Sequence, residues 1–386
     1  MIPYGRQEIS QADIDAVVDV LRSDFLTQGP MVPRFEQAVA AKVGATYAVA
    51  MNSATSALHI ACLALDLGPG DRLWTVPNTF VASANCGRYC GAGVDFVDID
   101  PATWNLSLPR LQEKLFQAKQ GGRLPKVVVP VHFAGQPTEQ EAIWELAKEF
   151  GFKVIEDASH AIGASRRGEP VGSCRWSHIT VFSFHPVKII TTGEGGMALT
   201  NDEELAWRMG MLRTHGITRE PERMTRPPAG PWAYEQQALG FNYRMTDIQA
   251  ALGVSQLARL EEWVKRRNGL ASRYDERLQG LPLRLPTVRP ENYSAFHLYA
   301  VRIKPEVPKK TRREIFENLR AAGIGVNVHY MPVHLQPYYR DLGFKPGQFP
   351  EAEAHGEETI TLPLYPTLTD TQQDRVVDTL RELFAA

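Results

Sequence analysis

The sequence predicts an α/β protein with a mostly parallel central sheet flanked by helices, plus a smaller α+β domain at the C-terminal end. Two observations predict this class. From residue 47 onward, short runs that are apolar throughout alternate with segments of helical periodicity, which is typical of parallel strands covered on both faces. In the last third, one long helical stretch is followed by short strands and helices in mixed order, which indicates a separate α+β unit.

The first helix is predicted at residues 11–22, because Ser10 is a suitable N-cap, Asp13 completes a capping box, and the apolar residues that follow recur at helical spacing. Continuous apolar runs predict strands at 47–51, 71–76, 94–97, 126–131, 152–156 and 179–184. Helices are predicted between them at 55–67, 83–90, 107–117 and 139–150. Glycine and proline at 68–70 end the first of these four.

The last third is predicted to begin with one helix at 247–279, rich in Arg, Glu and Leu. It continues with strands at 297–303 and 325–329 and helices at 311–322 and 370–384. Residues 216–237 hold many Arg, Pro and Glu residues without a clear period and are predicted to form a loop. The predicted domains are therefore residues 1–246, with an N-terminal arm that can pack on the smaller domain, and residues 247–386.

Composition excludes several classes of protein. The 42 Lys and Arg residues against 44 Asp and Glu give a net charge of −2, which lacks the basic excess of a general nucleic-acid or membrane-surface binder. Four cysteines are too few for a disulfide framework. The sequence begins without a signal-peptide core, and no apolar run approaches the ~18 residues of a membrane helix. We expect a cytoplasmic protein with no nucleic-acid or membrane partner.

Polar residues follow three of the predicted strands, at the edge where open parallel sheets bind ligands. Residues 52–56 join a strand to a helix N-terminus, whose free N–H groups suit a phosphate. Glu156 and Asp157 end a second strand, and Lys188 lies in the loop after a third. Each segment alone has an ordinary structural explanation, namely helix capping for the first two and a solvated surface lysine for the last.

Together, the three segments supply what pyridoxal phosphate requires. Its phosphate takes a helix N-terminus, its pyridine nitrogen takes a carboxylate, and its aldehyde takes a lysine. Asp157 and Lys188 are separated by about one strand–helix–strand unit, so that both can face one cleft. The combination predicts an enzyme that uses this cofactor.

At this point the sequence resembles the DegT/StrS family of sugar aminotransferases, pyridoxal phosphate enzymes of the aspartate aminotransferase fold (fold type I). Four motifs occur in family order, namely NSATSAL, EDASHAIG, SFHPVKIITTGEGG and FNYRMTDIQAALGVSQL. The resemblance extends from SDFLTQGP to LPLYP at residues 362–366. It implies a transamination with L-glutamate as amino donor, in a homodimer with shared active sites.

Within the family, the runs SDFLTQGP, TFVASANC, DFVDIDP, VHFAGQ and VHYMPVH are most similar to the branch that serves pseudaminic acid biosynthesis. This similarity implies UDP-2-acetamido-2,6-dideoxy-β-L-arabino-hexos-4-ulose as the amino acceptor. Another keto-sugar nucleotide, dTDP- or GDP-linked and aminated at C3 or C4, remains an alternative.

The resemblance also implies roles for individual residues. Lys188 would be the Schiff-base lysine and general acid/base, Asp157 would pair with the pyridine nitrogen, and His160 would lie near the phenolic oxygen of the cofactor. The other implied cofactor contacts are Ala54 and Thr55 at the phosphate, Ser183 as a further donor, Phe80 on the ring, and Asn242 at the phosphate of the partner subunit's cofactor. The implied substrate contacts are Tyr4, Asp24, Phe25, Leu26, Thr27, His329 and Tyr330.

Three alternatives compete with this prediction. Asp98 and Asp100 resemble the metal-binding DxD of nucleotide-sugar glycosyltransferases, although Pro101 follows directly and turn chemistry explains both carboxylates. Cys86 and Cys90 lie one helical turn apart but lack further ligands nearby, so buried free thiols are predicted and no metal site. A non-catalytic regulator of the same fold is a third alternative, which the presence of Lys188 opposes.

Overall fold

The computed structural model describes residues 1–304 and 310–385. At its centre is a seven-stranded sheet in the order β1-β9-β8-β5-β4-β2-β3. The strands are β1 (Tyr47–Met51), β2 (Arg72–Thr75), β3 (Gly93–Phe96), β4 (Val127–Val129), β5 (Lys153–Asp157), β8 (Ile179–Ser183) and β9 (Gly196–Thr200). Neighbouring strands are parallel except where β9 pairs with β1 and with β8. The predicted α/β class with a mostly parallel sheet is confirmed.

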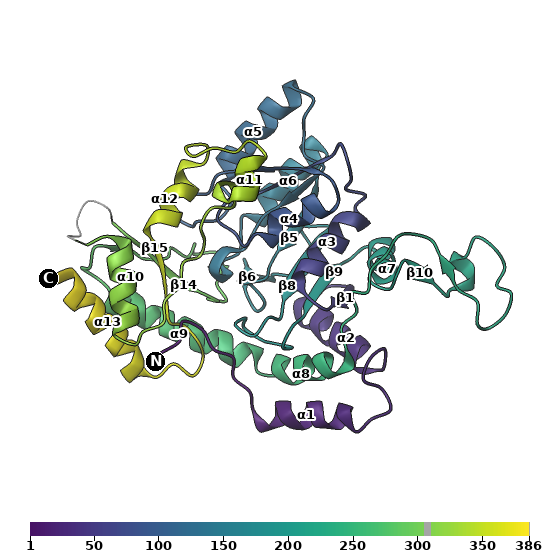
Figure 1. Ribbon diagram of the computed structural model, residues 1–386, viewed down its shortest axis with the longest axis horizontal. Coiled ribbons are helices and arrows are strands. Elements are labelled where there is room, and N and C mark those ends of the chain that lie inside the picture. Colours follow the sequence, from purple (N-terminus) through teal and green to yellow (C-terminus); the bar gives the residue numbers. More distant parts are fainter. Residues whose placement is uncertain (305–309, 386) are drawn as a thin grey trace.

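Helices cover both faces of this sheet (Figure 1). One face is packed by α3 (Ala54–Ala64), α4 (Ala82–Tyr89) and α7 (Glu203–Leu212). The other is packed by α2 (Met31–Val43), α5 (Leu108–Gln120), α6 (Gln140–Phe150) and α8 (Asp247–Leu257), with α1 (Gln11–Leu21) outside α8. In β4, Val127 and Val129 face one layer and Val128 faces the other, and all three are buried. Covering on both faces explains why the strands read as unbroken apolar runs.

The C-terminal elements gather around a second, smaller sheet, beside the N-terminus (Figure 1, left). This antiparallel sheet has the order β12-β14-β15, with β12 (Leu283–Arg284), β14 (Tyr299–Ile303) and β15 (Thr359–Leu362). Its core is shared by α9 (Leu260–Arg277), α10 (Arg312–Ala321) and α13 (Asp370–Ala385). Ile2 is buried in the same core and bridges Ile324. The N-terminal arm thus packs on the C-terminal elements, while the domain boundary after residue 246 stays a prediction.

Besides three short 3-10 helices, the described chain has further strands and α-helices. They are β6 (Ser165–Arg166), β7 (Glu169–Pro170) and β13 (Asn292–Tyr293) in one small sheet, β10 (Ile217–Thr218) and β11 (Glu235–Gln236) in another, and helices α11 (Pro337–Asp341) and α12 (Pro350–Glu358). The segment predicted as a loop at 216–237 contains β10 and β11 and projects from the body of the molecule (Figure 1, right). Within the described residues, no helix combines the length and apolar composition that crossing a bilayer requires.

Two predicted elements were wrong in detail. The helix expected at 247–279 is interrupted at Ala258 and Arg259, whose N–H groups bond to carbonyls three residues back, the pattern of a tightened last turn. The Arg259 guanidinium there binds Asp13 at 2.6 Å, which ties the break to α1. The strand expected at 325–329 is reduced to a single bridge, in which Asn327 pairs with Thr361 of β15. Residues 327–330 line the cavity, so the segment leaves the small sheet after this bridge.

Candidate active site

A cavity of about 440 Å³ lies at the carboxyl ends of β5 and β8, where an open α/β sheet is expected to bind its ligand. The N-terminal arm, the β1–α3 turn, the loop before α4, the loop after β8 and residues 327–330 complete its wall. Ten of the predicted site residues line it, namely Tyr4, Ala54, Thr55, Phe80, Asp157, His160, Ser183, Lys188, His329 and Tyr330. The structure therefore brings together segments that are distant in the sequence.

The β1–α3 turn presents a helix N-terminus to this cavity. Ser53 caps α3, because its hydroxyl oxygen accepts the N–H of Ser56 at 3.1 Å. Ala54 and Thr55 are the first two residues of α3, so their N–H groups have no carbonyl to bond within the helix. Free N–H groups and the positive end of the helix dipole favour an anion here. Ser183 lines the same cavity and adds a hydroxyl, so this part of the site fits a phosphate.

Asp157 ends β5 and is 5% exposed. Its Oδ1 accepts the N–H of Ser159 at 3.0 Å, and its Oδ2 accepts the hydroxyl of Ser83 at 2.6 Å. A carboxylate has about four lone-pair positions, so two donors leave room for another. Because Asp157 also lines the cavity, it can accept a hydrogen bond from a protonated ring nitrogen there. This geometry fits the role predicted for it.

Lys188 lies in the loop that joins β8 to β9. The loop is closed at its base, where Ser183 and Gly196 are register partners, and the N–H of Thr192 bonds to the carbonyl of Phe184 at 3.0 Å. Burial lowers the pKa of the Lys188 amino group to about 8, and the charge of Asp157 acts in the opposite direction. An amine with such a pKa is partly neutral near pH 7, as a nucleophile toward an aldehyde must be.

His160 is buried beside these groups, and its hydrogen bonds define its tautomer. The N–H of Ala134 donates to Nδ1 at 3.3 Å, so the proton of the neutral ring is on Nε2, 3.1 Å from the hydroxyl oxygen of Tyr330. Burial, with the charges of Lys188 and His329 adding to it, holds the pKa of His160 well below its usual value. His160 is thus a neutral donor on the cavity wall, as a contact to a phenolic oxygen requires.

Phe80 lies at the cavity and is 57% exposed, so it is not the core aromatic that a sequence without family resemblance would suggest. Its ring is tilted toward that of Tyr330, with 6.4 Å between the centroids. An aromatic ring that faces an open cavity can stack on a planar ligand.

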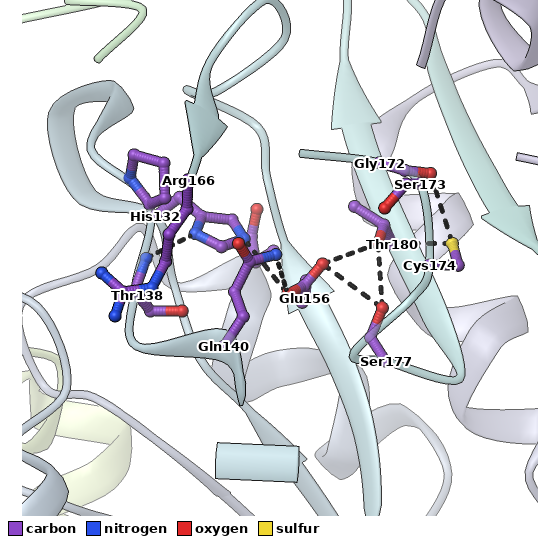
Figure 2. A network of polar contacts seen from close by, with 12 residues as sticks. His132, Thr138, Gln140, Glu156, Arg166, Gly172, Ser173, Cys174, Ser177 and Thr180 are labelled. Carbon is purple, nitrogen blue, oxygen red and sulfur yellow. Dashed lines mark hydrogen bonds and ion pairs between the residues drawn. The ribbon is translucent and has the colours of Figure 1, made fainter. Parts of the chain in front are cut away.

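The opposite face of β5 carries a separate network of buried polar contacts (Figure 2). Its centre is Glu156, which accepts hydrogen bonds from Gln140 at 2.6 Å, Thr180 at 2.8 Å and Ser177 at 3.3 Å. Burial acts to raise the pKa of Glu156, but His132, Gln140 and Thr180 outweigh it and lower the pKa. Successive side chains of a strand point to opposite faces, so the acidic pair is divided. Asp157 faces the cavity, and Glu156 faces a network that joins β5 to β8 and α6.

Five predicted site residues do not line the cavity. Asn242 is exposed, and its backbone bridges that of Thr214. The segment 24–27 is also exposed and reaches the start of α8, where Thr27 bridges Thr246. Phe25 is 53% exposed and Leu26 is 48% exposed. These residues form part of an outer surface of the single chain, so their predicted roles stay predictions.

Several cavity residues were not predicted, including Thr79, His185, Glu194, His297 and Asn327. Thr79 belongs to the TFVASANC run and His185 to the SFHPVK run, so the signal for both was present in motifs already identified. His297 and Asn327 come from the C-terminal part of the chain. Only the fold shows that these residues reach the cavity.

The two aspartates of the DxD sequence are explained by backbone capping. Asp98 accepts the N–H groups of Ile99, Glu351 and Ala352, and thereby holds the start of α12. Asp100 accepts the N–H groups of Ala102 and Thr103 in a tight turn. Within the described residues, no group of three or more His, Cys, Asp or Glu side chains is arranged to hold a metal ion. Turn and capping chemistry accounts for both carboxylates.

Comparison with known proteins agrees with this geometry. The profile of the DegT/DnrJ/EryC1/StrS aminotransferase family matches residues 7–381. SpsC, a spore coat polysaccharide biosynthesis protein of Bacillus subtilis, is 38% identical over 385 residues, which cover 99% of this chain and 97% of SpsC.

Two similar solved structures are PseC and Spr1654. PseC of Helicobacter pylori, an aminotransferase involved in the biosynthesis of pseudoaminic acid, has a TM-score of 0.90 and 30% identity, covering 100% of this chain and 99% of PseC. The PLP form of Spr1654 from Streptococcus pneumoniae has a TM-score of 0.89 and 30% identity, covering 100% of this chain and 98% of that chain.

Proposed function

Because the chain belongs to the DegT/DnrJ/EryC1/StrS aminotransferase family, we propose that it transfers the amino group of L-glutamate to a nucleotide-linked 4-keto-6-deoxy sugar. The enzyme is an aminotransferase and its cofactor is pyridoxal phosphate. The observation that supports the proposal most is the cavity in which the α3 N-terminus, Asp157 and Lys188 meet. The proposed acceptor is UDP-2-acetamido-2,6-dideoxy-β-L-arabino-hexos-4-ulose, on the basis of the motifs shared with the pseudaminic acid branch and the likeness to PseC.

In the proposed reaction, pyridoxal phosphate supplies an electron sink for the pair of electrons released at the donor Cα. Lys188 would anchor the cofactor and, when its amino group is free, would move a proton at the donor Cα. Asp157 would accept the proton of the ring nitrogen. The His160 Nε2–H, 3.1 Å from the hydroxyl oxygen of Tyr330, would lie near the phenolic oxygen of the cofactor. The N–H groups of Ala54 and Thr55 would hold the phosphate, with Ser183 as a further donor.

The proposed acceptor sugar contacts the outer wall of the cavity, formed by Tyr4, His329 and Tyr330. Tyr4 and His329 pack with ring centroids 5.6 Å apart, and His329 Nδ1 lies 2.8 Å from the hydroxyl of Thr361. Burial lowers the pKa of His329 to about 3, so the ring is neutral at pH 7. A neutral, partly aromatic wall suits a sugar ring, which combines apolar faces with hydroxyl groups.

The active unit is proposed to be a homodimer in which Asn242 reaches the phosphate in the partner's site, and residues 24–27 meet the substrate there. Two observations support this arrangement. Asn242 and residues 24–27 are exposed in one chain, and Thr27 bridges Thr246, four residues after Asn242 and directly before α8. In addition, Trp232, Tyr234 and Leu239 are strongly exposed on or next to the projecting segment (Figure 1), as is common for residues that a partner covers.

The experiment that tests the proposed function is a substrate panel. The purified holoenzyme is incubated with L-glutamate and with UDP-, dTDP- and GDP-linked keto sugars, and the products are identified by mass spectrometry and NMR. We expect a 4-amino sugar from the UDP-linked 4-keto substrate, and no product with Lys188→Ala. Amination at C3, or acceptance of dTDP-linked sugars alone, would contradict the proposed acceptor.

A further inference from the structure

Asp157 is held on the cavity side by a short chain of hydroxyl groups from the α4 region. Ser83 Oγ lies 2.6 Å from Asp157 Oδ2, and Thr79 Oγ1 lies 2.8 Å from Ser83 Oγ. All three side chains are buried, with Ser83 at 0%, Thr79 at 3% and Asp157 at 5% exposure. Ser83 is in the first turn of α4, three residues after Phe80. One short segment therefore supplies both an aromatic ring for the cavity and a contact to the carboxylate.

The direction of these hydrogen bonds follows from which of the three groups can donate a proton. A serine hydroxyl has one proton, and an ionised carboxylate can only accept. The proton of Ser83 is therefore directed at Asp157 Oδ2, and Ser83 Oγ must accept the proton of Thr79. Because Oδ1 accepts the N–H of Ser159, both oxygens of Asp157 are held by fixed donors before any ligand arrives. A hydrogen bond to a charged group inside the protein is shorter and stronger than one between neutral groups.

We propose that Ser83 is a positioning residue for the transamination and that Thr79 orients the Ser83 hydroxyl. Together, the two hydroxyl groups hold the Asp157 carboxylate in line with the ring nitrogen of the cofactor. Ser83 does not line the cavity, so it would act through Asp157. The inference rests on the proposed role of Asp157. It predicts that the hydroxyl at position 83, more than the size of the side chain, is what the reaction needs.

The other face of β5 provides a matched control. Ser177 is a buried serine, 5% exposed, whose hydroxyl donates to the neighbouring carboxylate, Glu156, at 3.3 Å (Figure 2). Ser83→Ala and Ser177→Ala thus delete the same chemical group beside adjacent acidic residues of one strand. Only the first deletion touches the carboxylate that faces the cavity, so a general effect of losing a buried serine can be separated from an effect on the site.

The test measures the half reaction of the holoenzyme with L-glutamate in single turnover, together with the pH titration of the bound cofactor's absorbance and the cofactor dissociation constant. Ser83→Ala is expected to slow the half reaction roughly ten- to a hundredfold, as the loss of a charge-assisted hydrogen bond implies, with little change in the KM for L-glutamate. The pH midpoint of the change in the cofactor's absorbance should move upward. A ring nitrogen that holds its proton less firmly carries less positive charge, so it repels less the proton on the nitrogen that joins the cofactor to Lys188. Ser83→Thr, which keeps the hydroxyl, should restore the rate to within about threefold of the wild-type rate.

Thr79→Val removes the hydroxyl that donates to Ser83 and keeps the shape of the side chain. It should therefore slow the half reaction and raise the titration midpoint as Ser83→Ala does, but by less. It also keeps the proposal testable if Ser83→Ala does not fold. Equal rates and equal titrations for Ser83→Ala and Ser177→Ala, or the lack of any effect of Thr79→Val, would overturn the proposal. Failure of the proposed function itself looks different, because the wild-type holoenzyme would then not react with L-glutamate at all.

Discussion

Gly196 of β9 packs directly on the backbone of Ala54, so that a Cβ atom at position 196 would overlap the Ala54 nitrogen and the Ser53 carbonyl carbon. The two residues meet because Gly196 is the register partner of Met51, the last residue of β1, immediately before the turn that starts α3. The N–H groups proposed to hold the phosphate are therefore positioned by a glycine on the neighbouring strand.

Gly196→Ala is expected to displace the Ser53–Ala54 turn, because the clash is with backbone atoms that cannot rotate away. We expect a destabilisation of about 1–3 kcal/mol in urea unfolding and a cofactor dissociation constant at least tenfold higher, measured by equilibrium dialysis. Gly210→Ala is the control. It lies within α7 with open space around its Cβ position and should stabilise the chain by roughly 0.4–1 kcal/mol. Equal cofactor affinity in the two variants would contradict the packing argument.

The pKa of Lys188 predicts how cofactor uptake depends on pH. The amine must be neutral to attack the aldehyde, and burial lowers its pKa to about 8. Reconstitution of the apoprotein with pyridoxal phosphate, followed by absorbance, should therefore accelerate from pH 6 to pH 8 and then level off. A lysine with an ordinary pKa would continue to accelerate to about pH 10. After borohydride reduction, mass spectrometry should find the cofactor on Lys188, and Lys188→Ala should carry none.

The two acidic residues at the end of β5 should differ in their effect on activity. Asp157→Asn weakens the acceptor at the ring nitrogen, so the half reaction with L-glutamate should slow by at least about a hundredfold. Because it also replaces an oxygen that accepts a buried hydrogen bond from Ser83 or Ser159, it should lower the unfolding free energy by about 1–3 kcal/mol. Glu156→Gln replaces an oxygen that accepts buried hydrogen bonds with a donor, and should lower the unfolding free energy by about 1–3 kcal/mol. The half reaction of the Glu156→Gln variant with L-glutamate should change in rate by less than about threefold. The reverse pattern would mean that the faces of β5 are assigned wrongly.

Neutral buried histidines predict loss of stability in acid. His329 titrates near 3 in the folded chain, because of burial, and an unfolded histidine titrates near 6.5. The unfolded chain therefore takes up this proton first, so stability falls as pH falls from 6.5 toward 3. At pH 5 this residue alone should cost about 2 kcal/mol relative to pH 8. Urea unfolding of the apoprotein at several pH values measures the slope, and His329→Asn should reduce the slope by about one proton.

The shared site can be tested by mixing two inactive chains. If Asn242 acts in the partner's site, a mixed dimer of Lys188→Ala and Asn242→Ala chains has one site with both defects and one site with none. Co-refolded mixtures should therefore recover activity that neither variant shows alone, up to about a quarter of the wild-type value if the chains assort at random. Recovery would not occur if Asn242 served the site of its own chain.

Much of this fold could be predicted because local patterns carry it. The apolar runs of β1 and β5 are buried on both faces, and the capping box at Ser10 and Asp13 is present at 2.8 Å. The predicted strand at 325–329 shows the limit. Its residues alternate as a strand would, and the free edge of β15 lies beside it, but only Asn327 pairs there before the segment turns into the cavity wall. Whether a segment stays alongside a neighbouring strand depends on tertiary packing, which no local pattern states.

The candidate site also contains residues that the sequence could predict and residues that it could not. Lys188, Asp157 and the α3 N-terminus could be predicted because each is the chemical group that the cofactor itself requires. Ser83 belongs to the TFVASANC run, but its contact with Asp157 could not be predicted. Asp157 is 74 residues away, and a serine in the first turn of a helix has an ordinary explanation as a capping residue. His297 reaches the cavity from the C-terminal part of the chain, so its place depends on how the small sheet packs.

The loop that carries Lys188 leaves and re-enters the sheet at one register pair, Ser183 and Gly196, because β9 runs antiparallel to β8. The register of the sheet therefore does not fix the length of this loop. Core packing does, because Ile189 and Ile190, which directly follow Lys188, are buried in one cluster with residues of α2 and α8. The position of the proposed Schiff-base lysine thus depends on helices at the back of the sheet, whereas Asp157 is positioned by the end of a strand.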